Sequence, residues 1–239
     1  MSLKGNGLPV KPTLFSKPIF EADFELIGGK TYFLVGENGV GKSSFLRTLR
    51  VHHDQNSKFL QSTGVCETEF YSPPHKICSN SISLEKFCSA FGFEDQLDKW
   101  ELGNCREKTT DQLSQGQKCR TMLAYAFSRQ ASVLLLDEPS NGLDASSRAI
   151  FAEEVKLRSN EGLVTVISSH DFSLITDQIA NIIYLKYLGP TRSFSQHSLD
   201  FQKATLSFGS EKIENQTFPE LSRFIEDRLI KQILDGAGK

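Results

Sequence analysis

The most chemically specific stretch of this chain is a glycine-rich segment, GENGVGKS, at residues 36–43. It fits the pattern G-x-x-x-x-G-K-[ST], in which glycines allow backbone N–H groups to surround phosphate oxygens at the start of a helix. In this pattern Lys42 reaches the β- and γ-phosphates of a nucleotide. The hydroxyl of Ser43 binds Mg²⁺, a cation that prefers oxygen ligands. We call residues 36–43 the phosphate loop.

Two adjacent carboxylates, Asp137 and Glu138, provide a second set of groups suited to nucleotide hydrolysis. They follow residues 133–136, a continuous apolar run typical of a parallel strand that is buried on both faces. Phosphoryl transfer requires mainly positioning and charge neutralisation from the protein. We therefore expect Asp137 to hold the Mg²⁺ shell and Glu138 to polarise the attacking water. A solvated acid pair at a strand end is the structural alternative.

A histidine follows another predicted strand. Residues 163–167 form an apolar run, and two serines lead from it to His170. Ligands of open α/β sheets bind outside the carboxyl ends of the strands, so we expect His170 to contact the γ-phosphate or the attacking water. A structural histidine is the alternative.

The segments on either side of the phosphate loop are those that such a loop requires. Residues 31–35 are apolar and β-branched, which predicts a strand. Residues 44–50 place Phe45, Leu46 and Leu49 on one face of a predicted helix. The order strand, loop, helix is the context in which the pattern binds phosphate.

Two further segments complete an order of motifs: LSQGQ at residues 113–117 and NGLD at residues 141–144. We call them the LSQGQ loop and the NGLD loop. With the segments above, they make the chain resemble the nucleotide-binding domains of the ATP-binding cassette (ABC) family over roughly residues 10–190. In that family the LSGGQ-type segment, here LSQGQ, binds the γ-phosphate of a nucleotide held by the partner protomer. The resemblance therefore implies a head-to-tail dimer with two composite sites.

Within the LSQGQ loop, Ser114 offers a hydroxyl group and Gly116 lets the backbone approach a phosphate. We expect a helix to follow from about Lys118 to Arg129. The NGLD loop is expected to carry Asp144 across the dimer interface. The residues assigned to the nucleotide are Phe15, Gly36, Asn38, Gly39, Gly41, Lys42, Ser43, Ser44, Ser114, Gly116, Gln117 and Asp144. The metal ligands are expected to be Ser43 and Asp137, and the catalytic groups Glu138, His170 and Lys42.

Phe15 enters this assignment because the resemblance implies an aromatic residue that stacks on adenine. Phe20 is the other candidate, and the spacing favours Phe15. Stacking on an aromatic ring tolerates different bases, so it only weakly predicts ATP over GTP. A phenylalanine in a small core is the alternative.

Two stretches depart from the family's pattern. Family members place a glutamine after an apolar-proline turn, whereas the matching residues 70–75 contain none and put Pro74 or His75 at that position. Either His75 replaces the polar contact, or the site is slow or leaves this role to water. The segment between Arg50 and Phe70 is also short, which predicts a reduced antiparallel β-subdomain.

The resemblance implies an α/β fold, a P-loop NTPase (ABC ATPase) core with that reduced β-subdomain and a helical subdomain. We expect the ATPase domain at residues 1–190, with the helical subdomain at about 76–130. Residues 191–239 are expected to form a C-terminal extension in which the strand pattern stops. An apolar stripe predicts an amphipathic helix at about 220–234.

The expected helical subdomain contains an apolar stripe of roughly helical spacing, and Ser83 is placed to begin a helix. Exposed members of the stripe would mark a docking groove for a membrane subunit, whereas a plain core is the alternative. The stripe consists of Ile82, Leu84, Phe87, Phe91 and Leu97.

Composition narrows the class of protein. A length of 239 residues with 38% hydrophobic and 23% charged residues suits one globular domain with subdomains. A formal net charge of −2 and the lack of a basic run argue against broad nucleic-acid binding. No apolar run approaches the roughly 18 residues of a membrane-spanning helix, so we expect any membrane role to come through a partner.

We therefore interpret the chain as the ATP-binding and ATP-hydrolysing subunit of an ABC transporter, with ATP and Mg²⁺ as ligands. It is expected to act as a homodimer or heterodimer of nucleotide-binding domains that energises separate integral membrane (permease) subunits. Its place is then the cytoplasmic face of the membrane, with no direct nucleic-acid partner. The alternatives are a soluble non-transport ABC ATPase acting on ribosomes or DNA, and a slow regulatory cassette.

Overall fold

The computed structural model describes most of the first 169 residues and several strands beyond them. The described residues are 2–13, 16–36, 38–54, 58–63, 68–71, 82–129, 131–169, 181–188, 191–200, 205–208 and 211–213. Phe15, Pro74, His75 and His170 lie outside the described residues, as does the helix expected at 220–234.

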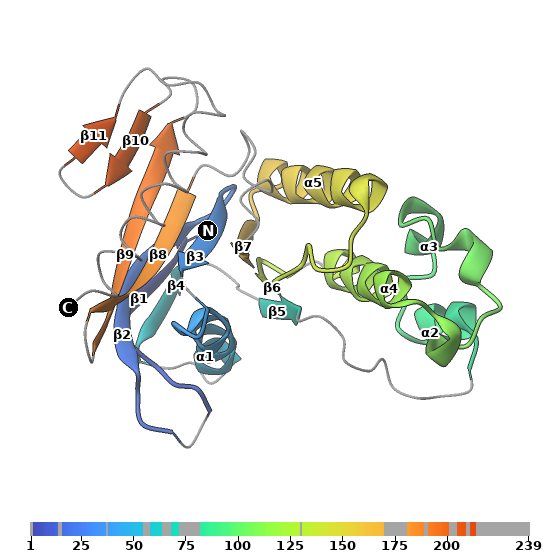
Figure 1. Cartoon of the computed structure of the whole chain (residues 1–239), viewed down its shortest axis with the longest axis horizontal. Coiled ribbons are helices and arrows are strands. Elements are labelled where there is room, and N and C mark those ends of the chain that lie inside the picture. Colours follow the sequence, from blue (N-terminus) through green and yellow to red (C-terminus); the bar gives the residue numbers. More distant parts are fainter. Residues whose placement is uncertain are drawn as a thin grey trace.

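Two sheets and five α-helices make up the described part of the fold (Figure 1). The strands are β1 (Ser2–Val10), β2 (Phe20–Ile27), β3 (Thr31–Gly36), β4 (Leu60–Thr63), β5 (Thr68–Tyr71), β6 (Val133–Asp137), β7 (Val164–Ser168), β8 (Asn181–Leu188), β9 (Thr191–Asp200), β10 (Thr205–Phe208) and β11 (Glu211–Ile213). The helices are α1 (Lys42–Asp54), α2 (Leu84–Ala90), α3 (Gln96–Lys99), α4 (Gln115–Ser128) and α5 (Ala145–Asn160), with 3₁₀ turns η1 (Gly103–Cys105) and η2 (Thr110–Gln112).

The larger sheet brings three functional strand ends to one edge. Its strand order is β11-β10-β9-β8-β3-β7-β6-β5, and the pairs from β8 to β5 are parallel. Strand β7 therefore lies between β3 and β6. Because parallel strands end at the same edge of a sheet, Gly36, Ser168 and Asp137 lie at neighbouring strand ends, and Asp137 is paired in register with Ser168.

The smaller sheet is antiparallel, with strand order β2-β1-β4, and it packs against α1. The Phe24 ring covers Gly5 so closely that a Cβ at position 5 would lie 2.3 Å from Phe24 Cε1. The same ring meets Phe45 of α1 edge to face, at a centroid distance of 5.4 Å. This packing fixes α1, whose first residue is Lys42.

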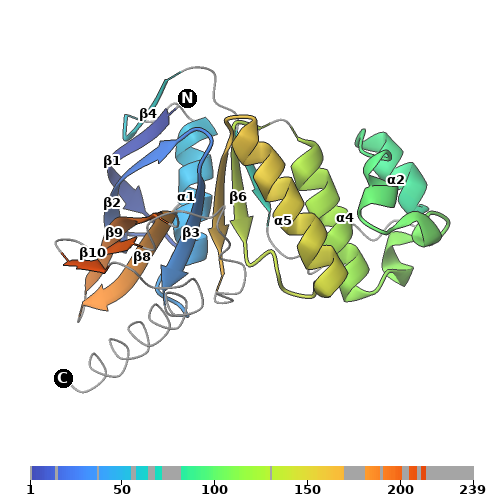
Figure 2. The ribbon, with the colours of Figure 1, turned by 90° about the horizontal axis from the view of Figure 1, so that it is seen from above.

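Alternate residues of the central strands serve two separate cores. In β3, Tyr32 and Leu34 belong to the core that includes α1 and the smaller sheet. Phe33 and Val35 belong to the core that includes α2 to α5. Figure 2 shows the same division at β6, with α1 on one side of this strand and the adjacent helices α4 and α5 on the other. The sheet is thus covered on both faces, as expected for parallel strands.

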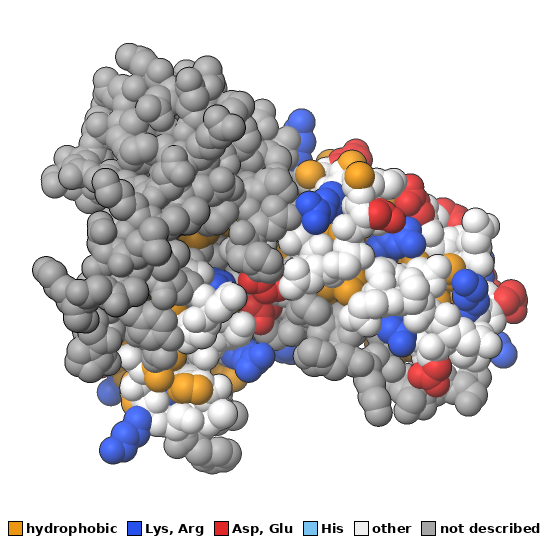
Figure 3. All heavy atoms as spheres, in the orientation of Figure 1, with side chains coloured by type: hydrophobic (Ala, Val, Ile, Leu, Met, Phe, Trp, Pro, Cys, Tyr) orange, Lys and Arg blue, Asp and Glu red, His pale blue; other side chains and the backbone are white. Residues whose placement is uncertain are grey.

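The helical segment contains two short helices rather than one continuous stripe. Ser83 begins α2 as predicted, since its side chain accepts a hydrogen bond from the Lys86 N–H. The helix ends before Gly92, whose φ of +71° lies in the left-handed region. Leu84, Phe87 and Leu97 are buried, Ile82 is partly buried and Phe91 is 52% exposed. Charged side chains of both signs are interspersed over this end of the molecule (Figure 3, right).

None of the helices in the described part of the chain combines the length and apolar character that crossing a membrane requires. Beyond residue 190 the structure corrects the sequence analysis, because the strand pattern does not stop there. Strand β9 pairs antiparallel with β8 along its length, from Asn181 with Ser198 to Leu188 with Thr191. Strands at the side of a sheet pair through backbone hydrogen bonds and do not require an apolar sequence. For this reason the polar sequence after residue 190 did not predict these strands.

A buried arginine ties the last part of α5 to the chain before β6. Arg158 is 4% exposed. Its Nη2 donates to the Ala131 carbonyl oxygen at 2.6 Å, and its Nη1 donates to that of Arg129 at 3.4 Å. Burial lowers the pKa of Arg158 to about 10. Arg158 thereby holds α5 against the segment that leads into the Asp137 strand.

Replacing Arg158 with methionine keeps much of the buried volume but removes the donor to both carbonyls. We expect the free energy of unfolding to fall by about 2–4 kcal/mol, because an unsatisfied buried polar group is costly. Chemical denaturation followed by circular dichroism measures this change. Lys156→Met, an exposed position of the same helix, is the control. Equal stability of the two variants would contradict the role given to Arg158.

Candidate functional site

The phosphate loop requires glycine at both of its ends. Gly36 has a φ of +152°, and a Cβ there would lie 2.4 Å from the carbonyl oxygen of Leu185. Gly41 has a φ of +117°, and its Cβ would lie 2.9 Å from Ile19 Cδ1. A side chain at position 36 would therefore collide with backbone, and one at position 41 would be strained by the positive φ. The loop therefore folds into a turn that leads directly into α1, as the sequence pattern predicts.

Lys42, the first residue of α1, is a buried cation at the centre of the loop. It is 7% exposed, and its Nζ donates to the Gly36 carbonyl oxygen at 2.7 Å. Burial lowers the pKa of Lys42, while the negative charges of Glu138 and Asp137 act in the opposite direction. The exposed N–H groups of a helix start and its positive dipole end lie at the same place. This arrangement suits the binding of an anion such as a nucleotide phosphate.

Asp137 joins the phosphate loop to the neighbouring strand ends. It is 5% exposed. Its Oδ1 accepts hydrogen bonds from Ser43 Oγ at 2.9 Å and from Ser168 Oγ at 2.6 Å. A hydroxyl oxygen beside a carboxylate oxygen is a donor set that suits Mg²⁺, which binds few protein oxygens and keeps several waters. The residues present therefore fit the predicted metal site.

Glu138 leaves the strand direction immediately after Asp137. Its φ is +48°, a left-handed conformation that is uncommon for a residue with a side chain. The Glu138 N–H donates to the Ser168 carbonyl oxygen at 2.9 Å and to Ser168 Oγ at 3.2 Å. Ser168 thus fixes both carboxylate residues. The conformation also differentiates them, because Glu138 does not simply follow the alternation of the strand.

The LSQGQ loop forms the start of α4. Ser114 Oγ accepts a hydrogen bond from the Gln117 N–H at 3.2 Å, and Gln117 Oε1 accepts one from the Ser114 N–H at 2.9 Å. This reciprocal capping box starts α4 at Gln115, so the start expected near Lys118 is wrong by three residues. The S-x-x-Q spacing was the signal for the earlier start. Ser114 is exposed, and its hydroxyl hydrogen remains available to donate outward.

The NGLD loop packs on the LSQGQ loop of the same chain. A Cβ at Gly116 would lie 2.9 Å from the Gly142 carbonyl oxygen. Gly142 itself has a φ of +85°. At the end of the loop, Asp144 Oδ1 accepts the Ser147 N–H at 2.9 Å and begins α5. Hydrogen bonds from Ser147 lower the pKa of Asp144, which is exposed and negatively charged.

The predicted site residues therefore fall into two groups. The first group consists of the phosphate loop with the residues next to it, namely Gly36, Asn38, Gly39, Gly41, Lys42, Ser43, Ser44, Asp137 and Glu138. The second lies at the starts of α4 and α5 and consists of Ser114, Gly116, Gln117 and Asp144. Phe15 and His170 lie outside the described residues. The sequence analysis did not assign a role to Ser168, whose only signal was its place at the end of a predicted strand.

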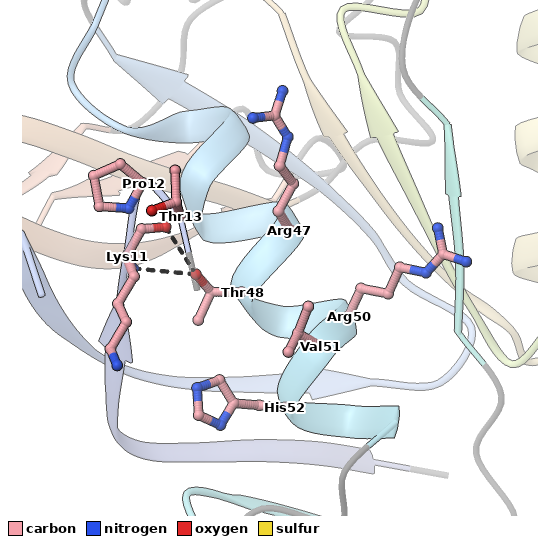
Figure 4. Close-up of a pocket in the computed structure, with 8 residues that line it drawn as sticks. All are labelled: Lys11, Pro12, Thr13, Arg47, Thr48, Arg50, Val51 and His52. Carbon is pink, nitrogen blue, oxygen red and sulfur yellow. Dashed lines mark hydrogen bonds between the residues drawn. The ribbon is translucent and has the colours of Figure 1, made fainter. Parts of the chain in front are cut away.

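A cavity of about 400 Å³ lies on the flank of α1, against the segment that follows β1. Basic residues line part of it, namely Lys11, Arg47, Arg50 and His52. Figure 4 shows the side chains of Lys11, Arg47 and Arg50 pointing in three different directions, so their charges do not converge on one point. Burial, and then the charge of Lys11, lower the pKa of His52. We assign no ligand to this cavity.

Comparison with known proteins identifies the family to which these motifs point. The ABC transporter family matches residues 19–141. The zinc import ATP-binding protein ZnuC of Acinetobacter baylyi is 31% identical over 188 residues, which cover 73% of this chain and 72% of that protein. The lantibiotic transport ATP-binding protein SrtF of Streptococcus pyogenes is 29% identical over 178 residues, with coverage of 67% and 76%.

A solved structure supports the fold. The structure described as the ATP binding subunit of an ABC transporter has a TM-score of 0.68 and is 16% identical in sequence. It covers 95% of this chain, and the match spans 99% of that chain. At this sequence identity the likeness shows the fold, a P-loop ATPase core of mixed α/β type, as the sequence analysis predicted.

Replacing Ser168 with alanine tests the geometry around Asp137. We expect affinity for ATP with Mg²⁺ to fall by about tenfold, since a hydrogen bond to a charged group contributes about 1.5 kcal/mol. Affinity for ATP without Mg²⁺ should change less, because Asp137 is then not required as a metal ligand. Isothermal titration calorimetry measures both affinities. Ser128→Ala in α4 is the control, and an unchanged Mg²⁺-ATP affinity for Ser168→Ala would contradict this role.

Proposed function

Because the chain belongs to the ABC transporter family, we propose that it hydrolyses ATP to energise transport through separate membrane subunits. The observation that carries this proposal is the arrangement at Asp137. Its Oδ1 lies 2.9 Å from Ser43 Oγ of the phosphate loop, and Glu138 follows it in a left-handed conformation. Metal ligand, phosphate loop and candidate base are thereby held within one hydrogen-bonded unit.

ATP binding is proposed to begin at the phosphate loop. When the nucleotide arrives, Lys42 exchanges its hydrogen bond with the Gly36 carbonyl for the β- and γ-phosphates. Their negative charge favours the protonated lysine and opposes the effect of burial on its pKa. Ser43 and Asp137 would hold Mg²⁺, which would neutralise part of the negative charge of the phosphate groups.

Hydrolysis is proposed to depend on the different placement of two adjacent carboxylates. Asp137 is committed to two hydroxyl groups. Glu138 is turned away from the strand direction and held there through its N–H by Ser168. A carboxylate in that position can accept a proton from a water molecule in line with the γ-phosphate. The strain of a left-handed glutamate is of the kind found at functional sites.

A second copy or a related chain is proposed to complete each site. Ser114 is exposed at the start of α4, where a phosphate of a neighbouring protomer can be bound. Asp144 is exposed at the start of α5 and would extend across the dimer interface. A head-to-tail dimer would place the LSQGQ loop of each chain over the phosphate loop of the other. Closure of this dimer on ATP and its opening after hydrolysis would then move the attached membrane subunits.

The membrane subunits are proposed to contact the helical segment at the cytoplasmic face of the membrane. Phe91 is an aromatic side chain that is 52% exposed at the end of α2. Its ring lies 4.9 Å from that of Phe87 and 6.0 Å from that of Tyr125, measured between centroids. This exposed aromatic edge offers apolar area to a partner helix.

Glu138→Gln tests the proposed catalysis. We expect steady-state ATP hydrolysis to fall by at least about 100-fold, since a general base contributes about 10²–10⁴-fold. ATP binding should persist, and an ATP-dependent dimer should accumulate because the nucleotide is no longer consumed. Phosphate release, calorimetry and light scattering measure the three properties.

Lys42→Ala provides the contrasting variant, because it should weaken ATP binding itself. Unchanged turnover in Glu138→Gln would refute the catalytic assignment. Absence of hydrolysis in the unmodified chain, with ATP binding intact, would instead favour the slow regulatory cassette.

A further inference from the structure

Glu101 lies in a turn between α3 and η1 and belongs to none of the motifs described above. Its carboxylate joins two other elements. Glu101 Oε1 accepts a hydrogen bond from Ser146 Oγ at 2.6 Å, and Glu101 Oε2 lies 3.4 Å from Arg120 Nη1. Ser146 belongs to the first turn of α5 and Arg120 to α4. One side chain therefore bridges the helices that begin with the NGLD and LSQGQ loops.

The backbone at Glu101 is held in an unfavourable conformation. Among the described residues, Glu101 and Glu138 are the two non-glycine residues with a left-handed φ, at +54° and +48°. Such a conformation persists only where the surroundings hold it, and it clusters at sites with a functional requirement. A glycine would adopt it without steric cost. The presence of glutamate here therefore suggests that the side chain is needed.

The surroundings that hold the bend belong to α4. Trp100 is fully buried and stacks on Phe127 with a centroid distance of 5.9 Å. The Arg120 guanidinium donates to the carbonyl oxygens of Trp100 and Glu101, each at 3.4 Å. These contacts fix the base of the Glu101 side chain, so less conformational freedom is lost when the carboxylate binds Ser146.

A single exposed ion pair would carry little weight. Glu101 is 49% exposed and Arg120 14% exposed, and surface pairs of this kind contribute little to stability. The fold also has a second connection between the same regions, because Lys99 forms an ion pair with Glu154 of α5. Loss of the Glu101 carboxylate should therefore alter the relative placement of α4 and α5 more than it alters folding.

The placement of α4 against α5 matters because both helix starts face the proposed partner site. Close to those starts, Gly116 and Gly142 pack against each other. Farther along the helices, the Phe127 ring of α4 meets the Phe151 ring of α5 at a centroid distance of 5.8 Å. The Glu101 bridge adds a polar contact between α4 and α5 near their starts, where the LSQGQ and NGLD loops lie.

We propose that Glu101 is a positioning residue that locks the LSQGQ loop to the NGLD loop. While Glu101 is bound to both Ser146 and Arg120, Ser114 and Asp144 approach the partner protomer as one rigid unit. The inference rests on the proposed ATP hydrolysis in a head-to-tail dimer. It assigns Glu101 no contact with ATP, so the phosphate loop of a single protomer should bind the nucleotide equally well without it.

The test compares Glu101→Gly, Ser146→Ala and the double variant. Glu101→Gly removes the carboxylate while relieving the backbone strain. We expect kcat to fall by about fivefold in each single variant, a size typical of one exposed polar contact. The double variant should fall no further, because both substitutions break the same bond. The affinity of the monomer for ATP, measured by calorimetry, should remain that of the unmodified chain.

Two further variants separate positioning from general damage. Glu101→Gln keeps an oxygen that can accept from Ser146, so it should retain most of the ATPase activity. Glu107→Gly makes the same glutamate-to-glycine change at an exposed turn of the same segment and should retain all of the activity. Wild-type kcat in Glu101→Gly, or a double variant that loses the product of the two single effects, would overturn the inference. An unmodified chain without hydrolysis would refute the proposed function instead.

Discussion

A single carboxylate oxygen, Oδ1 of Asp137, accepts hydrogen bonds from Ser43 and Ser168, and the rest of the site depends on this meeting of three elements. It is possible only because β7 lies between β3 and β6 in the sheet. Asp137 and Lys42 are both buried, and the negative charge of Asp137 opposes the lowering of the Lys42 pKa by burial. Ser168 also holds the turned Glu138 backbone next to this centre.

From that centre the chain leads outward to the surface that a partner would meet. The Asn141 N–H donates to the Glu138 carbonyl oxygen at 3.3 Å, so the NGLD loop begins directly at the candidate base. Gly142 then contacts Gly116, and Asp144 starts α5. In the proposed head-to-tail dimer, the hydrolytic centre of one site and the groups offered to the other would thus be parts of one continuous structure. This continuity gives a physical route by which a change at one nucleotide can influence the second.

Short motifs with local causes could be predicted from the sequence, and contacts between distant elements could not. The phosphate loop, the buried strand before Asp137 and the Ser83 helix start each depend on residues a few positions apart. Ser168 and Glu101 depend on strand order and on helix packing, which no local pattern reveals. The strands after residue 190 were missed because their pairing comes from the backbone. The early start of α4 could have been predicted, because Ser114 and Gln117 have the spacing of a capping box.

The central claim is that each working site contains groups from two chains, and complementation between two inactive variants tests it most directly. Lys42→Ala lacks a functional phosphate loop, and Ser114→Arg obstructs the LSQGQ loop, so each should be inactive alone. Random mixing makes about half of the dimers mixed, each with one intact site, which predicts recovery of up to about a quarter of the wild-type ATP turnover. A mixture as inactive as its components, beside an active unmodified chain, would contradict the composite site.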